Sequence, residues 1–139
     1  MLFFTGFSRI SSEIAKSHVV NMSKNANELH QMRAMVDDAV AILCSGRDIR
    51  FLGDLLHQGW MHKRKLSNQV SNASIDALYD RARNAGAIGG KLLGAGGGGF
   101  MLMFVAPSDQ AAVRAELSEL IHVPFKFETS GSQVIYYKP

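Results

Sequence analysis

Apolar residues recur three or four positions apart through most of the first half of the chain. This spacing predicts amphipathic helices, because residues three and four apart share one face of a helix. Four helices are expected: from Ser11 or Ser12 to about residue 22, from about residue 29 to 43, from Asp48 to Trp60, and from Ser74 to Ala85. In the second, one stripe predicts the buried face: Leu29, Met32, Val36, Val40 and Leu43.

The second half of the chain changes to strand patterns. A short strand opens the chain at residues 2–5, and a strand-length apolar run spans residues 100–106. Pro107 and Ser108 then predict the start of a helix that reaches Ile121. Apolar residues at 125–128 and 134–137 predict two final strands. Helices followed by strand, helix and strands indicate an α+β fold, in which helices cover an antiparallel sheet.

The densest signal is the stretch from Gly89 to Phe100, in which seven of twelve residues are glycine. Such a run predicts a backbone that bends sharply, and successive N–H groups in a bend can form an anion site. The stretch contains G-x-G-x-x-G, but it follows a helix and precedes a strand, which is the reverse of the dinucleotide-binding order. No Gly-Lys-Ser/Thr ends it, so it is not a phosphate loop of the Walker type.

The segment from Gly86 to Phe104 closely resembles the third signature motif of the GHMP sugar and metabolite kinases. The opening residues 4–9 and the run 60–67 are similar to the heptose-phosphate kinase and fucokinase branch of that family. The resemblance implies a ferredoxin-like C-terminal domain over residues 1–139, without the nucleotide-binding N-terminal domain. It also implies an ATP-dependent kinase that phosphorylates a hydroxyl of a heptose 7-phosphate-like sugar. ATP and Mg²⁺ are expected in the intact enzyme, and no cofactor is expected in this chain alone.

The resemblance suggests which residues serve the site. The glycine loop faces the active cleft in this family, which points to Lys91, Gly94, Ala95, Gly96, Gly97, Gly98 and Gly99 as substrate-binding or loop residues. Thr5, Ser8 and Arg9 follow a strand end, and the Arg9 guanidinium could bind a substrate phosphate with two donors. No catalytic residue and no metal ligand is expected in this chain. The alternative from another class is a stand-alone ferredoxin-like module that binds an anionic ligand without catalysis.

The amino-acid composition and charge indicate which classes of protein this chain resembles. Hydrophobic residues make up 47% of the chain and charged residues 19%, which is typical of a globular domain. The net charge of +3 suits phosphorylated substrates, and aromatic residues do not alternate with the basic ones as in nucleic-acid binding. No apolar run spans a membrane and no secretion signal is recognised, so a cytoplasmic location is expected. The five histidines form no metal motif, and the single Cys44 is expected to be buried.

The expected binding partners follow from this reading. They are a sugar phosphate substrate and a separate N-terminal kinase domain, and neither nucleic acid nor membrane is expected to bind. A face that meets another domain is apolar, so we also expect the chain to self-associate or to bind that domain.

Overall fold

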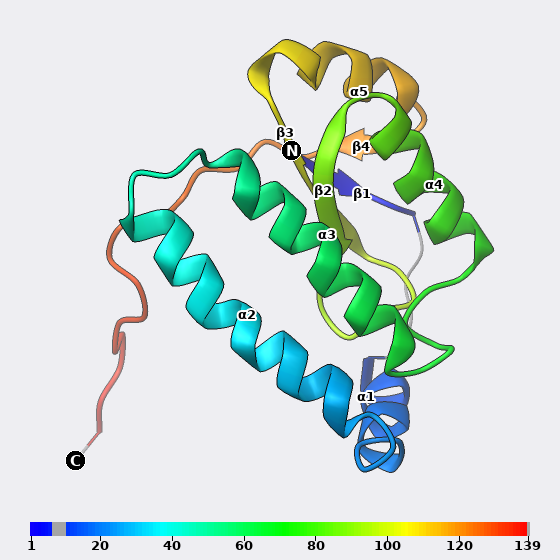
Figure 1. The fold of residues 1–139 in the computed structure, drawn as a ribbon, viewed down its shortest axis with the longest axis vertical. Coiled ribbons are helices and arrows are strands. Elements are labelled where there is room, and N and C mark those ends of the chain that lie inside the picture. The colour runs from blue at the N-terminus through cyan, green and yellow to red at the C-terminus, as the bar shows by residue number, and fades with distance from the viewer. Residues whose placement is uncertain (7–10, 139) are drawn as a thin grey trace.

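The computed structural model describes residues 1–6 and 11–138. Its elements are β1 (Leu2–Phe4), α1 (Ser11–Val20), α2 (Ala26–Cys44), α3 (Arg50–Lys65), α4 (Ala73–Asn84), β2 (Ala87–Leu92), β3 (Phe100–Val105), a 3₁₀ turn (Pro107–Asp109), α5 (Gln110–Glu116) and β4 (Ile121–His122). Within these residues the strands form one four-stranded antiparallel sheet in the order β2-β3-β1-β4. The expected α+β fold with helices covering an antiparallel sheet is therefore confirmed (Figure 1).

The two faces of β3 pack against different helices. Alternate residues Met101 and Met103 are fully buried, and they share the core with Phe3 and with apolar residues of α4 and α5. The next residue, Phe104, lies on the opposite face, where Gly53 of α3 approaches it. Figure 1 shows α3 crossing the sheet at β2 and β3, with α2 beside it on the outside.

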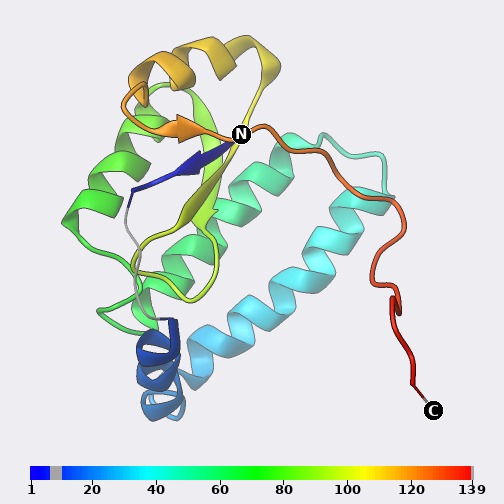
Figure 2. The ribbon, with the colours of Figure 1, turned by 180° about the vertical axis from the view of Figure 1, so that it is seen from behind.

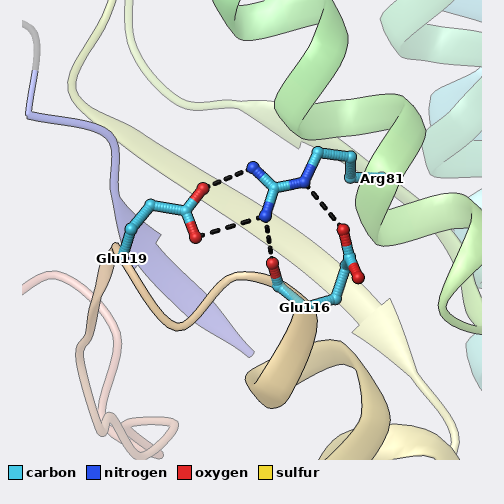
Figure 3. A network of polar contacts seen from close by, with 3 residues as sticks. All are labelled: Arg81, Glu116 and Glu119. Atoms are coloured by element: carbon cyan, nitrogen blue, oxygen red, sulfur yellow. Dashed lines mark hydrogen bonds and ion pairs between the residues drawn. The ribbon is translucent and has the colours of Figure 1, made fainter.

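Helix α4 buries the apolar residues that recur at helical spacing along it. Ile75, Leu78, Tyr79 and Ala82 are all buried. The side-chain oxygen of Asn72 accepts a hydrogen bond from the amide of Ile75 at 3.0 Å and caps the helix. On its outer side, Arg81 donates to Glu116 at 2.8 Å and to Glu119, which ties α4 to the end of α5 (Figure 3).

The buried face of α2 matches the predicted stripe at Leu29 and Met32, which pack against the core, and differs from it further along the helix. Val36, Val40 and Leu43 are 54 to 61% exposed. Met35 is half-buried and Ile42 is buried instead. Both sets of residues recur at helical spacing, and the set that includes Met35 and Ile42 is the one that packs toward α3. Cys44, which we expected to be buried, is also exposed at the end of this helix.

The prediction for the end of the chain is wrong in part. Helix α5 stops at Glu116, and Ile121–His122 forms the edge strand β4, which pairs with β1. From residue 124 to 138 the chain contains neither helix nor strand, so the two final strands are not found. This segment extends away from the sheet past the end of α2 (Figure 2). Its apolar residues Val134–Tyr137 are 77 to 95% exposed.

Candidate functional site: the glycine loop and its surroundings

The glycine-rich stretch divides into a strand and a loop. Gly89, Gly90 and Lys91 lie in β2, whereas we expected the whole stretch to form a loop between a helix and a strand. The loop proper spans residues 93–99 and joins β2 to β3. At its base the amide of Leu93 donates to the carbonyl oxygen of Phe100 at 2.8 Å, so the loop begins as the continuation of a hairpin.

The far end of the loop is held by Thr5. Both the amide and the hydroxyl of Thr5 donate to the carbonyl oxygen of Gly99, at 2.8 and 2.9 Å. Thr5 is 4% exposed, so this anchor lies inside the protein. Ser8 and Arg9, the other residues of the predicted phosphate-binding group, lie outside the described residues. The structure gives Thr5 a supporting role, and contact of this group with a substrate phosphate stays a prediction.

The middle of the loop rests on the connection between α3 and α4. The amide of Gly97 donates to the carbonyl oxygen of Val70 at 2.8 Å. Gly96 has φ of +128°, and a Cβ at this position would lie 2.7 Å from the backbone of Val70. Any larger residue at position 96 would separate the two segments. Thr5 and Val70 thus hold the loop against the rest of the domain.

Beside this contact lies a small polar hollow of about 180 Å³. Its walls are Asn68, Gln69, Ser71, Asn72 and Gly97. The N-terminus of α4 lies at this hollow, because its cap Asn72 forms part of the wall. Ser71, also in the wall, donates to Asp76 in the first turn of α4. The polar run of residues 68–72 by itself predicts only a turn between two helices. Their polar side chains were visible in the sequence, but their position against Gly97 depends on the fold.

Two lysines lie at the start of the loop. Lys63, at the C-terminal end of α3, donates to the carbonyl oxygens of Leu92 at 3.2 Å and of Gly94 at 2.5 Å. Burial, together with the nearby charge of Lys91, lowers the pKa of Lys63 to about 8. The Lys63 ammonium also lies 6.0 Å from the centre of the buried Trp60 ring. Lys91 was predicted from the motif, whereas Lys63 belonged to a basic run that the sequence alone could not connect to the loop.

A larger hollow of about 740 Å³ lies at the other end of α3. It is lined by Asp38, Ile42, Arg47, Phe51, Asp54 and His57, among others. This hollow touches α3 from Phe51 to Gln58, whereas the glycine loop contacts Lys63 near the C-terminal end of the same helix. His57 accepts or donates a hydrogen bond with Tyr79 at 2.8 Å, and burial raises the pKa of the Tyr79 phenol to about 12. This pair stabilises the packing of α3 on α4 and is separate from the glycine loop.

Two findings concern metals and membranes. Among residues 1–6 and 11–138, no three His, Cys, Asp or Glu side chains lie together in a group that could hold a metal ion. In the same part of the chain, none of the helices is long and apolar enough to cross a membrane.

Comparison with known proteins is consistent with this architecture. Residues 35–122 match the family model described as "GHMP kinases C terminal". The chain is 33% identical over 110 residues to the D-glycero-alpha-D-manno-heptose 7-phosphate kinase of Campylobacter jejuni, covering 78% of this chain and 32% of that enzyme. It is 34% identical over 118 residues to the L-fucokinase/L-fucose-1-P guanylyltransferase of Bacteroides fragilis, covering 82% of this chain and 12% of that protein.

Solved structures resemble the fold at lower identity. The mevalonate kinase of L. major in complex with R-mevalonate superposes with a TM-score of 0.72 at 20% identity, over 85% of this chain and 37% of that chain. The mevalonate kinase of Methanococcus jannaschii gives 0.66 at 21%, over 85% of this chain and 35% of that chain. The chain thus spans about a third, or less, of the length of these proteins. The match to the family model over residues 35–122, more than half of the chain, shows that it belongs to the GHMP kinase family and contains the C-terminal domain of that family.

Proposed function

We propose that this chain is the substrate-side, C-terminal domain of an ATP-dependent sugar kinase. The reaction would transfer the γ-phosphoryl group of ATP to a hydroxyl of a heptose 7-phosphate-like sugar. The observation that carries the proposal is the glycine loop of residues 93–99, which Thr5, Val70 and Lys63 hold in one conformation. Phosphoryl transfer depends mainly on positioning and charge stabilisation, and a fixed backbone loop serves both.

The free amides of the loop supply the chemistry. Leu93 and Gly97 donate to backbone carbonyls, whereas the amides of Ala95, Gly96 and Gly98 have no acceptor among the described residues. Amides that are fixed in place without an acceptor can stabilise negative charge on a phosphoryl group or a sugar oxygen. We place ATP and Mg²⁺, which would supply the phosphoryl group and neutralise its charge, mainly on the N-terminal kinase domain.

The proposal includes a protein partner for this chain. In the chain as described, Val134–Tyr137 and Phe127 expose large apolar side chains that a partner domain would cover. We propose that this partner is the N-terminal domain of the kinase, and that the separated chain self-associates in its absence. The cytoplasm, where ATP and sugar phosphates are found, is the proposed location. None of the relatives reported above is a stand-alone binding module, and that alternative is not retained.

A chimera tests the function. This chain would replace the matching segment of the Campylobacter jejuni heptose 7-phosphate kinase, and ADP release would be followed with heptose 7-phosphate, fucose and galactose. We expect turnover on the order of 1–100 per second with the preferred sugar. As a control, the enzyme's own segment is inserted at the same two junctions. A folded chimera without turnover on any sugar, beside an active control, would contradict the proposal. Turnover by the isolated chain would contradict its role as a substrate-side domain.

A further inference from the structure

Lys63 and Lys91 place two positive charges on one groove beside the glycine loop. They come from different elements, α3 and β2, and the charge of Lys91 contributes to lowering the pKa of Lys63. Neither ammonium forms an ion pair with any carboxylate in the described part of the chain. Glu28, which lies across from the end of α3, binds His62 and Lys65 instead. Like charges held together without a counter-ion destabilise the site, and a bound anion would relieve that repulsion.

The donors available at this point suit an anion with several acceptor oxygens. Lys63 uses two hydrogen bonds on the carbonyl oxygens of Leu92 and Gly94, which leaves one of its three donors free. The Lys91 ammonium makes no hydrogen bond with a described residue, so its donors are free as well. A phosphate group has oxygens enough to bind both lysines at once.

A groove leads away from the two lysines. It runs between α2 and α3, has a volume of about 260 Å³, and ends at Lys63 and Lys91. Its walls are apolar, with Met32 and Met35 on α2 and Leu52 and Leu56 on α3. Because Lys63 follows these leucines along α3, the charged end of the groove is the end that meets the glycine loop. The groove therefore offers a charged end and an apolar wall to one ligand.

We propose that Lys63 and Lys91 form a binding site for the phosphate group of a phosphorylated small molecule, whose remaining atoms lie along the groove between α2 and α3. The site stands on its own geometry and does not require the kinase activity. Because Lys63 also holds the start of the glycine loop, an anion bound here contacts the residue that positions the loop.

The isolated chain, labelled with ¹⁵N, tests the site directly. Inorganic phosphate would be added at pH 7 and constant ionic strength while the amide signals of residues 90–95 are followed. We expect saturable shifts in these signals, and Lys91→Met is expected to weaken binding roughly tenfold or more through loss of a charge-assisted contact. Lys126→Met removes one positive charge from the exposed terminal segment and serves as the control, with unchanged binding. Absence of saturable shifts, or equal weakening in both variants, would overturn the proposal.

A second variant covers the case in which Lys91→Met unfolds. Lys91→Glu supplies the missing carboxylate beside Lys63, so the chain is expected to remain folded and phosphate binding to be lost. Phosphate binding by folded Lys91→Glu with wild-type affinity would also overturn the site.

Competition identifies the source of the phosphate group. Glucose 6-phosphate and ATP without metal would each be titrated against inorganic phosphate. Displacement by either supports the site, and the stronger competitor shows whether it takes a sugar phosphate or a nucleotide. If neither displaces phosphate, the claim of a phosphorylated small molecule fails. Phosphate binding by the chain together with an inactive chimera would retain this site and remove the kinase proposal.

Discussion

A Cβ atom on Gly89 would lie 1.9 Å from the carbonyl oxygen of Gly53. The Gly53 carbonyl lies against Gly89 where α3 crosses β2, and the missing side chain of Gly89 allows the helix backbone to approach the strand backbone directly. A Cβ on Gly53 would instead meet the side chains of Ile88 and Phe104. The backbone contact fixes the height of α3 above the sheet, and thereby places Lys63, ten residues further along the helix, within reach of the glycine loop. A glycine that we assigned to the loop from the sequence is thus part of the helix–sheet packing.

We expect Gly89→Ala to lower the free energy of unfolding by about 3 kcal/mol or more. The added methyl would meet backbone, which cannot rotate away as a side chain can. Gly59→Ala is the matched control on α3, since its Cβ would lie in ordinary contact with Met35 at 3.4 Å. It should stabilise the chain by about 0.5–1 kcal/mol through higher helix propensity. Urea denaturation of both variants measures the difference, and similar stabilities would contradict the close backbone contact.

Gly97→Val should reduce kcat/KM of the chimera far more than it reduces stability. Gly97 has φ of +73°, which costs other residues about 1–2 kcal/mol, and its amide binds Val70 within the loop. Gly131→Val is the control, because Gly131 has φ of +63° but lies in the terminal segment with open space around it. Thermal melting and kcat/KM would be measured side by side. Equal loss of activity in the two variants would show that the loop has no special role.

Thr5→Val should lower stability by about 1 kcal/mol and loosen the end of the glycine loop. The substitution keeps the shape but removes the hydroxyl donor, and the Thr5 amide still donates to Gly99. Hydrogen exchange of the amides from Gly96 to Phe100 should become faster. Thr129→Val, at an exposed position, should leave both quantities unchanged. If Thr5→Val exchanges like the wild-type chain, the hydroxyl does not hold the loop.

Lys63 should make stability rise with pH between about 8 and 10. The unfolded chain keeps the Lys63 proton up to its ordinary pKa of 10.5, whereas the folded chain keeps it only up to about 8. In that window the unfolded state binds more protons, so the free energy of unfolding increases as the pH rises. Tyr79 acts in the opposite direction only above pH 10, because its folded pKa is about 12.

The difference in free energy of unfolding between the wild-type chain and Lys63→Met measures how much Lys63 contributes to the pH dependence of stability. Urea denaturation at pH 7, 8, 9 and 10 should show the gap between them shifting in favour of the wild-type chain as the pH rises. Lys126→Met should run parallel to the wild-type chain. A gap that stays constant with pH would contradict the burial of the Lys63 ammonium.

Most of the helices and the strands β1 and β3 can be predicted from local patterns in the sequence. Helical spacing located α3 and α4, and the apolar residues of α4 that recur at that spacing, from Ile75 to Ala82, are buried. An apolar run ended by Pro107 located β3. These elements follow from local periodicity, which the chain carries within each segment. The glycine stretch also pointed to the loop of residues 93–99 as the candidate site.

Other features depend on how the elements pack and could not be predicted from local patterns. Strand β2 contains Gly89 and Gly90, which disfavour strands, and pairing with β3 holds it in place. The pattern of residues 134–137 is typical of a strand, yet this segment pairs with neither edge of the sheet, β2 or β4. Lys63 is one of several basic residues at the end of α3. Only the close approach of Gly53 to Gly89 brings its ammonium to the carbonyls of the loop, because contacts between residues far apart in sequence depend on how the elements pack.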